Sequence, residues 1–371
     1  MTRRLTEGFS WRPTVHDELL IDLCIGSRTS RPTDVLALWE TWARGLSRPL
    51  GALEGGTARL LPLAAWRVRA VAGHLDSTDI TNGIALRRAL ATSSVDSQHT
   101  LLANERLICS LKAFGIDVIV LKGTALRATI YPAPATRPVS DLDVLIDPSM
   151  LDAARVWVAA NGGTLGYATI PTARSRAFRH AADTTVLDGT IDLHWRLLAD
   201  SFDERLDEAL RTRVVQFEIG STTTTTLSPE DHLLHAIAHG MWTNPLSPIR
   251  WVVDAALLLE THPIDWSIVL GEASARRLSD RMHVALSYLR ERFGVPVPIP
   301  VLDALMKRSS CGASPFPLTG MRWSKTGYGR AFDLLVARYV HGSTSWPLTR
   351  RVSMYPSYAR FVVSATSRRD G

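Results

Sequence analysis

Apolar residues follow a helical period over roughly the first hundred residues of the chain. Four of them fall on one stripe of a predicted helix: Leu36, Trp39, Ala43 and Leu46. Thr33, which follows Pro32, is the predicted N-cap of this helix, and Gly45 stands at its predicted C-cap. Further helices are predicted at about 57–75 and 84–114, and a break of the second near 93–96 is left open. The pattern therefore predicts an all-helical N-terminal region, residues 1–106.

The pattern changes at Gly115, where short β-branched or alternating runs begin. Strands are predicted at 117–121, 140–147, 184–187 and 190–195. The last two are joined by Asp188-Gly189, a strong hairpin signal, and a Thr-rich strand and turn follow at 221–226. Helices at 123–130 and 148–160 and a Pro-rich loop at 131–138 lie between the strands. The middle of the chain therefore mixes helices and strands.

Helical patterns return after the Thr-rich stretch. Ser228 and Asp231 have the spacing of a capping box, and helices are predicted from there to about 259, over 265–293 and over 330–341. We therefore divide the chain into the N-terminal helical region, a mixed core (107–227) and a C-terminal helical domain (228–371).

The composition limits the class of protein. With 371 residues, 46% hydrophobic and 21% charged, the chain has apolar material for two or three domains and too little charge for global disorder. No apolar run approaches the roughly 18 residues of a membrane helix, and the first residues lack the apolar stretch of a secretion signal. Cys24, Cys109 and Cys311 form no CxxC pair. We therefore expect a cytoplasmic protein without membrane segments.

Positive charge gathers toward the C-terminal end. The net charge of the chain is +6, and residues 271–371 hold 16 Lys and Arg against 6 Asp and Glu. A basic face of this kind suits phosphates, nucleic acid or an acidic partner. Only four of the 42 basic residues are Lys, so the Arg bias also fits the coding composition of a genome.

Asp141 and Asp143 form the most informative motif, within the run SDLDVL. Because side chains alternate along a strand, both carboxylates project from one face, about 6.6 Å apart along the backbone. Like charges this close repel unless a cation lies between them, which suits a divalent metal. Since they repel, replacing both is expected to leave the fold intact. Alone, the pair also fits polar residues on an exposed sheet face.

Two further features accompany this pair. Upstream, Lys122-Gly123-Thr124 ends a strand and begins a helix, where glycine lets a ligand approach the backbone and free amides face a phosphate. Downstream, Asp192 and His194 share one strand face. Three carboxylates beside a phosphate-binding turn are what a two-metal phosphoryl or nucleotidyl transfer site requires. P-loop, Rossmann and serine-hydrolase chemistries lack their motifs in this sequence.

In their order and local sequence these segments resemble a known family. The runs LKGTALRATIYPAPATRPVSDLDVLID, TIDLHWRLL, LSPEDHLLHAIAHG and RWVVDAALLLE are similar to the uncharacterised nucleotidyltransferase family of the DNA polymerase β-like superfamily, over about 107–260. The resemblance implies an α+β fold, with a small mixed-sheet nucleotidyltransferase core flanked by the two helical regions. It also implies two Mg²⁺ ions and a nucleoside triphosphate, which we interpret as ATP.

The resemblance also implies roles for individual residues. Asp141 and Asp143 would bind both metals, and Asp192 would bind the catalytic metal and deprotonate or orient the acceptor hydroxyl. The remaining candidates would contact the nucleotide or shape its pocket: Lys122, Gly123, Thr124, Arg137, Ser140, His194, His239 and Asp254. Thr124 departs from the Gly or Ser usual at its place in the family.

Several of these residues fit structural roles equally well. Lys122 fits a solvated strand end, Arg137 a salt bridge within a loop, and His194 a side chain that orients Asp192. The segment 174–180 carries three Arg and is interpreted either as a mobile basic loop over the triphosphate or as an exposed connection.

The predicted helices after Ser228 supply a second set of polar residues. His235 and His239 stand one helical turn apart, but the Glu of a zinc protease motif is missing between them, so zinc is disfavoured. With Arg250, Trp251 and Asp254 they are predicted to form a wall of the active site. Buried hydrogen bonds that hold two helices together explain the same residues.

These observations predict a Mg²⁺-dependent enzyme that transfers a nucleoside monophosphate, AMP from ATP, to a hydroxyl of a small molecule, peptide or protein. One alternative keeps this site with RNA or DNA as the acceptor, which the basic C-terminal region supports. The other is a non-catalytic regulatory protein that retains the fold, and the presence of all three carboxylates weighs against it.

Overall fold

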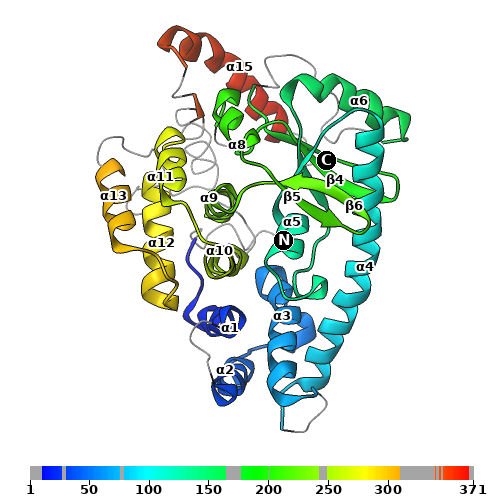
Figure 1. Ribbon diagram of the computed structural model, residues 1–371, viewed down its shortest axis with the longest axis vertical. Helices are drawn as coiled ribbons and strands as arrows, with labels where there is room; N and C mark the ends of the chain where they lie inside the picture. The colour runs from blue at the N-terminus through cyan, green and yellow to red at the C-terminus, as the bar shows by residue number, and fades with distance from the viewer. Residues whose placement is uncertain are drawn as a thin grey trace.

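The computed structural model describes residues 11–26, 31–75, 79–163, 177–199, 201–241, 249–309, 339, 342–343 and 346–366 (Figure 1). The N-terminal region is helical: α1 (Val15–Ile25), α2 (Pro32–Arg44), η1 (Leu50–Ala52), α3 (Gly55–Ala72) and α4 (Gly83–Ala113). The mixed part follows: β1 (Ile119–Val120), α5 (Lys122–Thr129), η2 (Pro134–Thr136), β2 (Leu142–Leu145), η3 (Pro148–Met150), α6 (Leu151–Ala160), β3 (Ala181–Val186), β4 (Gly189–His194), η4 (Glu204–Asp207), α8 (Glu208–Arg211), β5 (Val215–Ile219) and β6 (Thr222–Thr226). Helices complete the chain: α9 (Pro229–Gly240), α10 (Arg250–Thr261), α11 (Trp266–Ala275), α12 (Ser279–Phe293), α13 (Ile299–Ser309) and α15 (Leu348–Thr366).

The strands form one six-stranded mixed sheet in the order β3-β4-β2-β1-β6-β5. β2 pairs parallel with β4 and antiparallel with β1, and β1 pairs parallel with β6. β5 is an edge strand that was not predicted, although Val215, Phe217 and Ile219 alternate with polar residues and Ile219 joins the core of the sheet. The sheet flanked by helices confirms the predicted α+β class with a small mixed-sheet core.

One face of the sheet packs on α4 and α6. The alternating residues of β2 and β4 that turn to this face are fully buried: Leu142, Val144, Ile191 and Leu193. They join Leu107 and Leu111 of α4 and Trp157 of α6 in one apolar core. The alternate residues of the same strands, Asp143 and Asp192 among them, therefore point to the opposite face of the sheet.

The N-terminal and C-terminal helices share a second core. It joins Trp39 of α2 and Leu63 of α3 to Val253 of α10 and Leu289 of α12. α10 contacts both α1 and α9 and is buried along nearly its whole length, which places it at the centre of the helical half (Figure 1). The described helices include none that is long and apolar enough to cross a membrane.

The structure decides one open question about the helices and corrects one prediction. α4 runs unbroken for 31 residues, so there is no break near 93–96. The buried hydroxyls of Ser93 and Ser97 donate to the carbonyls of Ala135 and Pro134 in the Pro-rich loop. α2 begins with Arg31 as its N-cap and Pro32 in its first turn, so Thr33 does not cap it, while Gly45 is the C-cap as predicted.

The hairpin between β3 and β4 is confirmed, but its turn is shifted by one residue. Val186 pairs with Gly189, so the two-residue loop is Leu187-Asp188, and both residues have positive φ, 49° and 62°. These angles match a type I′ turn. Gly189 begins β4 instead, where a Cβ would lie 2.8 Å from Leu107 of α4. Helix packing therefore explains this glycine.

Leu187→Asn is expected to stabilise the protein by about 0.5–1 kcal/mol, because Asn tolerates the left-handed conformation that Leu adopts here at a cost. Leu187→Val should destabilise it, since a branched Cβ is worse at positive φ. The free energy of unfolding in urea checks both changes. Equal destabilisation by the two variants would contradict this account of the turn.

Candidate active site

The sheet brings two of the predicted aspartates side by side. β2 and β4 are parallel neighbours, and Asp143 pairs with Asp192 in the register. His194 lies two residues after Asp192 on the same face of β4. Leu121, at the end of β1, donates its backbone amide to the carbonyl of Asp143, which brings Lys122 to the same place.

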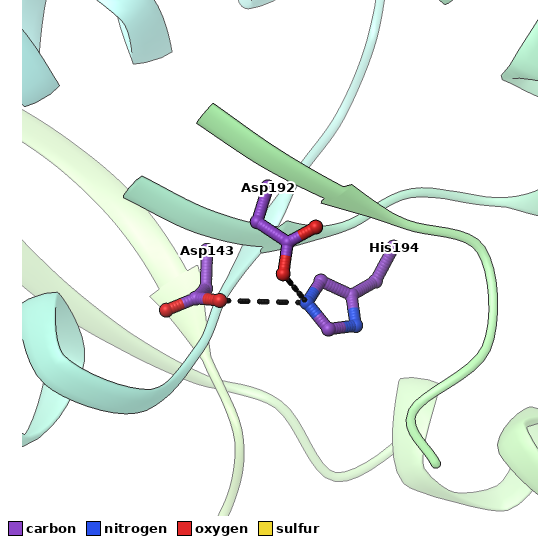
Figure 2. A group of neighbouring side chains, drawn as sticks. All are labelled: Asp143, Asp192 and His194. Carbon is purple, nitrogen blue, oxygen red and sulfur yellow. Dashed lines mark hydrogen bonds and ion pairs between the residues drawn. The ribbon is translucent and has the colours of Figure 1, made fainter. Parts of the chain in front are cut away.

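Asp143, Asp192 and His194 point toward one another (Figure 2). His194 Nε2 lies 3.0 Å from Asp192 Oδ2 and 3.4 Å from Asp143 Oδ1. One ligand atom of each residue lies within 4.8 Å of the others, a spacing that suits a metal ion. The Lys122 ammonium occupies the same place, 2.6 Å from Asp143 Oδ1 and 3.6 Å from Asp192 Oδ2. We call these four residues the charge cluster.

Opposite charges keep the cluster ionised despite its burial. Burial alone raises the pKa of Asp143, but the Lys122 ammonium and the His194 ring hold that pKa below its usual range. Burial also opposes ionisation of Asp192, whose pKa His194 and Lys122 hold far below its usual range. The two carboxylates in turn raise the pKa values of His194 and Lys122, against the effect of burial. The site therefore favours a cation between two carboxylates.

Lys122 has a strained backbone. Its φ is +46°, a region that residues other than glycine rarely adopt and that costs about 1–3 kcal/mol. This conformation begins α5 directly after β1 and places the ammonium on the two carboxylates. Such strain gathers at functional sites, where surrounding contacts maintain it.

Asp141 lies just before β2 and is not part of the group formed by Asp143, Asp192 and His194. Its Oδ1 accepts a hydrogen bond from the Ser140 hydroxyl. Burial and the charge of Asp143 raise the pKa of Asp141. These two effects outweigh Ser140 and Lys122, which lower the pKa of Asp141, and a bound cation would relieve the repulsion.

A cavity of about 310 Å³ opens beside the charge cluster. Its lining comes from α3, the start of α5, the segment leading into β2, and helices α9 and α10. Eleven predicted residues line it: Lys122, Gly123, Arg137, Ser140, Asp141, Asp143, His235, His239, Arg250, Trp251 and Asp254. Asp192, His194 and Thr124 are not in the lining. Asp192 reaches the cluster from the neighbouring strand, with 26% of its side chain exposed.

The turn at Gly123 and Thr124 is packed tightly. A Cβ at Gly123 would lie 2.6 Å from the Arg137 guanidinium and 3.0 Å from Val139, so glycine is required here by the protein itself. Thr124 is buried, and its hydroxyl accepts a hydrogen bond from the Asn104 side chain of α4 at 2.9 Å. The role proposed for this turn in phosphate binding therefore rests on the Lys122–Gly123 backbone.

Arg137 and Asp254 form a buried ion pair across the cavity wall. Arg137 donates to both carboxylate oxygens of Asp254, at 2.9 and 2.7 Å, and the Tyr131 hydroxyl donates to Oδ1 at 2.6 Å. Burial opposes both charges, but each partner stabilises the other, so the pKa of Asp254 is lowered and that of Arg137 is raised. This pair ties the segment before β2 to α10.

Two histidines of α9, His232 and His235, are buried, whereas His239 is exposed. Burial lowers the pKa of His232 to about 3 and that of His235 well below its usual range, so both rings are neutral at pH 7. His232 Nε2 lies 2.8 Å from the Thr226 hydroxyl. The rings of His235 and His239 are 6.0 Å apart and belong to no metal-binding group found among the described residues. All three line the cavity.

The cavity also contains residues that the sequence reasoning missed. Gly55, Gly56 and Arg59 come from α3, far from the motif in the sequence, and only the Gly-Gly pair opening a helix would have drawn attention to them.

Two of the Arg in the segment 174–180, Arg174 and Arg176, lie outside the described residues, as does most of the predicted helix at 330–341. Arg179 donates to the carbonyl of Ala181 at 3.2 Å.

A mixed sheet holds paired aspartates beside the turn from β1 into α5. This arrangement is the one expected of a nucleotidyltransferase core. The chain belongs to the uncharacterised nucleotidyltransferase family, whose model matches residues 57–294. The match confirms the resemblance seen in the sequence and extends it, because it begins in α3 and ends just after α12. The protein is therefore a nucleotidyltransferase. No curated protein matches the chain.

Asp254→Asn is expected to lower the free energy of unfolding by about 3–5 kcal/mol, because it leaves the buried Arg137 charge without its partner. Asp152→Asn breaks an exposed pair with Arg155 and should cost less than about 1 kcal/mol. Urea unfolding at neutral pH measures both changes. A loss for Asp254→Asn no larger than that for Asp152→Asn would contradict the structural role of the Arg137–Asp254 pair.

Acid should destabilise the protein through its buried histidines. An unfolded chain protonates histidine near pH 6.5, whereas folded His232 stays neutral to about pH 3, so stability falls as the pH drops from 6.5 toward 3. His232→Gln should remove about 2 kcal/mol of the loss between pH 7 and pH 5. Urea unfolding at both pH values tests this, with exposed His99→Gln as the control. An unchanged pH dependence in His232→Gln would contradict it.

Proposed function

We propose that this nucleotidyltransferase transfers AMP from ATP to a hydroxyl group of a small molecule, peptide or protein, using two Mg²⁺ ions. The observation that supports the proposal most strongly is the charge cluster, in which Asp143 and Asp192 meet around a cation. The cluster borders a cavity that also contains Asp141 and the start of α5. Paired carboxylates beside free helix amides suit a metal-bound triphosphate.

The donor set fits Mg²⁺. Asp141, Asp143 and Asp192 supply carboxylate oxygens, which this ion prefers, and the Lys122 ammonium already lies where a positive charge is stabilised. The raised pKa of Asp141 marks a carboxylate that a further positive charge would stabilise. Bound there, the metal ions would lower the pKa of the acceptor hydroxyl and neutralise charge on the departing pyrophosphate.

The residues of the chain have separable tasks in this proposal. Asp192, the more exposed of the two cluster carboxylates, orients the acceptor hydroxyl and takes its proton. His194, fully buried and 3.0 Å from Asp192 Oδ2, holds that carboxylate in place. The backbone of Lys122 and Gly123 faces the phosphates at the start of α5, and the Lys122 ammonium neutralises phosphate charge once it leaves Asp143.

The surroundings of Asp143 and Asp192 alter the stability that is expected when an aspartate of this site is replaced. The sequence alone predicts that replacing Asp141 and Asp143 costs no stability, because the two carboxylates repel each other on one face of the strand. β2 lies in the middle of the sheet, and Asp143 is buried against Lys122. Asp143→Asn removes the closer and more buried counter-charge of Lys122, at 2.6 Å against 3.6 Å for Asp192, so Asp192→Asn is the cleaner test.

Asp192→Asn is expected to reduce transfer by about a thousandfold or more while the protein remains folded. Purified protein is incubated with each α-³²P-labelled nucleoside triphosphate, Mg²⁺ and a cell extract, and the label is followed in protein, nucleic acid and small-molecule fractions. Asp117→Asn, at an exposed aspartate before β1, is the matched control and should retain full activity.

The distribution of label decides among the acceptors. Label in the small-molecule or protein fraction supports the proposal, whereas label in nucleic acid would show that the acceptor is RNA or DNA. Transfer that persists in Asp192→Asn would contradict the assigned site. Preferential transfer from another nucleoside triphosphate would show that ATP is not the preferred donor.

A further inference from the structure

One wall of the cavity carries positive charge that no carboxylate of the described residues neutralises. Four cationic side chains line the cavity. Lys122 and Arg137 are paired with Asp143 and Asp254. Arg59 of α3 and Arg250 of α10 have no acidic partner within ion-pair distance among the described residues.

Arg250 remains charged in this wall. It is half-buried, and its guanidinium donates to the carbonyl of Pro138 at 3.2 Å. Burial, together with repulsion from Arg137, lowers its pKa to about 10, so it is still a cation at neutral pH. A partly desolvated cation with one neutral hydrogen-bond partner gains free energy when an anion binds beside it.

The N-terminus of α3 adds backbone donors to the same wall. α3 is 18 residues long, and its first two residues, Gly55 and Gly56, line the cavity. The first amides of a helix have no partner within the helix. Glu54, at the N-cap position, makes no side-chain hydrogen bond to them. Because glycine has no side chain, a ligand can approach these amides closely.

Two buried side chains of the lining each carry a polar atom without a partner in the described part of the chain. His235 and Trp251 are 2% and 4% exposed, and both line the cavity. His235 Nε2 and Trp251 Nε1 have no hydrogen-bond partner among the described residues. The Trp nitrogen is a donor only, and buried donors in folded proteins normally have an acceptor.

We propose that Gly55, Gly56, Arg59 and Arg250 form an oxyanion-binding subsite, which takes a phosphate or carboxylate group of a substrate. The identity of that substrate rests on the proposed function, and the anion binding itself does not. The subsite lies in the helical half and is distinct from the Lys122–Gly123 turn. The anionic group therefore belongs either to the nucleotide or to an acceptor that carries its own negative charge.

Arg59→Gln tests the subsite in the full-length protein, because Arg59 is exposed on α3 and its loss should not disturb folding. Arg88→Gln removes the same charge from an exposed position of α4 and is the matched control. Isothermal titration with inorganic phosphate at low ionic strength should show about tenfold weaker binding to Arg59→Gln and no change for Arg88→Gln. Equal phosphate affinity in wild type, Arg59→Gln and Arg88→Gln would overturn the proposal.

A second titration, with a non-hydrolysable ATP analogue, identifies the source of the anion. If Arg59→Gln also binds the analogue about tenfold more weakly, the subsite holds the phosphate chain of the nucleotide. If analogue affinity is unchanged, and phosphate still binds to analogue-saturated wild type but not to analogue-saturated Arg59→Gln, the subsite holds an anionic acceptor. Neither titration requires turnover, so a failure of the transfer assay leaves the test of the subsite intact.

Discussion

The ion pairs around Lys122 are the interaction on which the rest of the site depends. Asp143 and Asp192 face each other across parallel strands, and without a positive charge between them one would have to take up a proton. Lys122 supplies that charge at 2.6 and 3.6 Å, from a backbone conformation that costs free energy. A fold that concentrates two carboxylates in this way, and strains a lysine to balance them, provides a group of side chains compatible with a bound metal ion.

The cavity beside the cluster is built jointly by the sheet and the helices. The segment before β2 is fixed to α10 by the Arg137–Asp254 pair, and α3 reaches the same cavity from the N-terminal region. The N-terminal and C-terminal helices share one apolar core, so packing joins the two parts of the wall. The family match, which includes most of α3 and all of α12, agrees with this joint construction.

The sequence predicted what depends on local pattern and missed what depends on packing. Alternation along 140–147 and 190–195 located β2 and β4 and the face that Asp143 and Asp192 share. The edge strand β5 is an exception, because Val215, Phe217 and Ile219 show the same alternation and the strand was still not predicted. Asp188-Gly189 located the hairpin, but its turn lies one residue earlier, at Leu187-Asp188, and Gly189 begins β4, where a Cβ would lie close to Leu107. The counter-ion role of Lys122 and the presence of Arg59 in the cavity arise from contacts between distant segments, which no periodicity records.

Binding of Mn²⁺, followed by electron paramagnetic resonance in the presence of a non-hydrolysable ATP analogue, tests the central claim most directly. If the charge cluster is a cation site, wild type binds Mn²⁺ and Asp192→Asn binds it at least about tenfold more weakly, because one of the paired carboxylates is lost. Asp117→Asn should bind it as wild type does. Undiminished Mn²⁺ binding by Asp192→Asn would show that the metal lies elsewhere and would contradict the account.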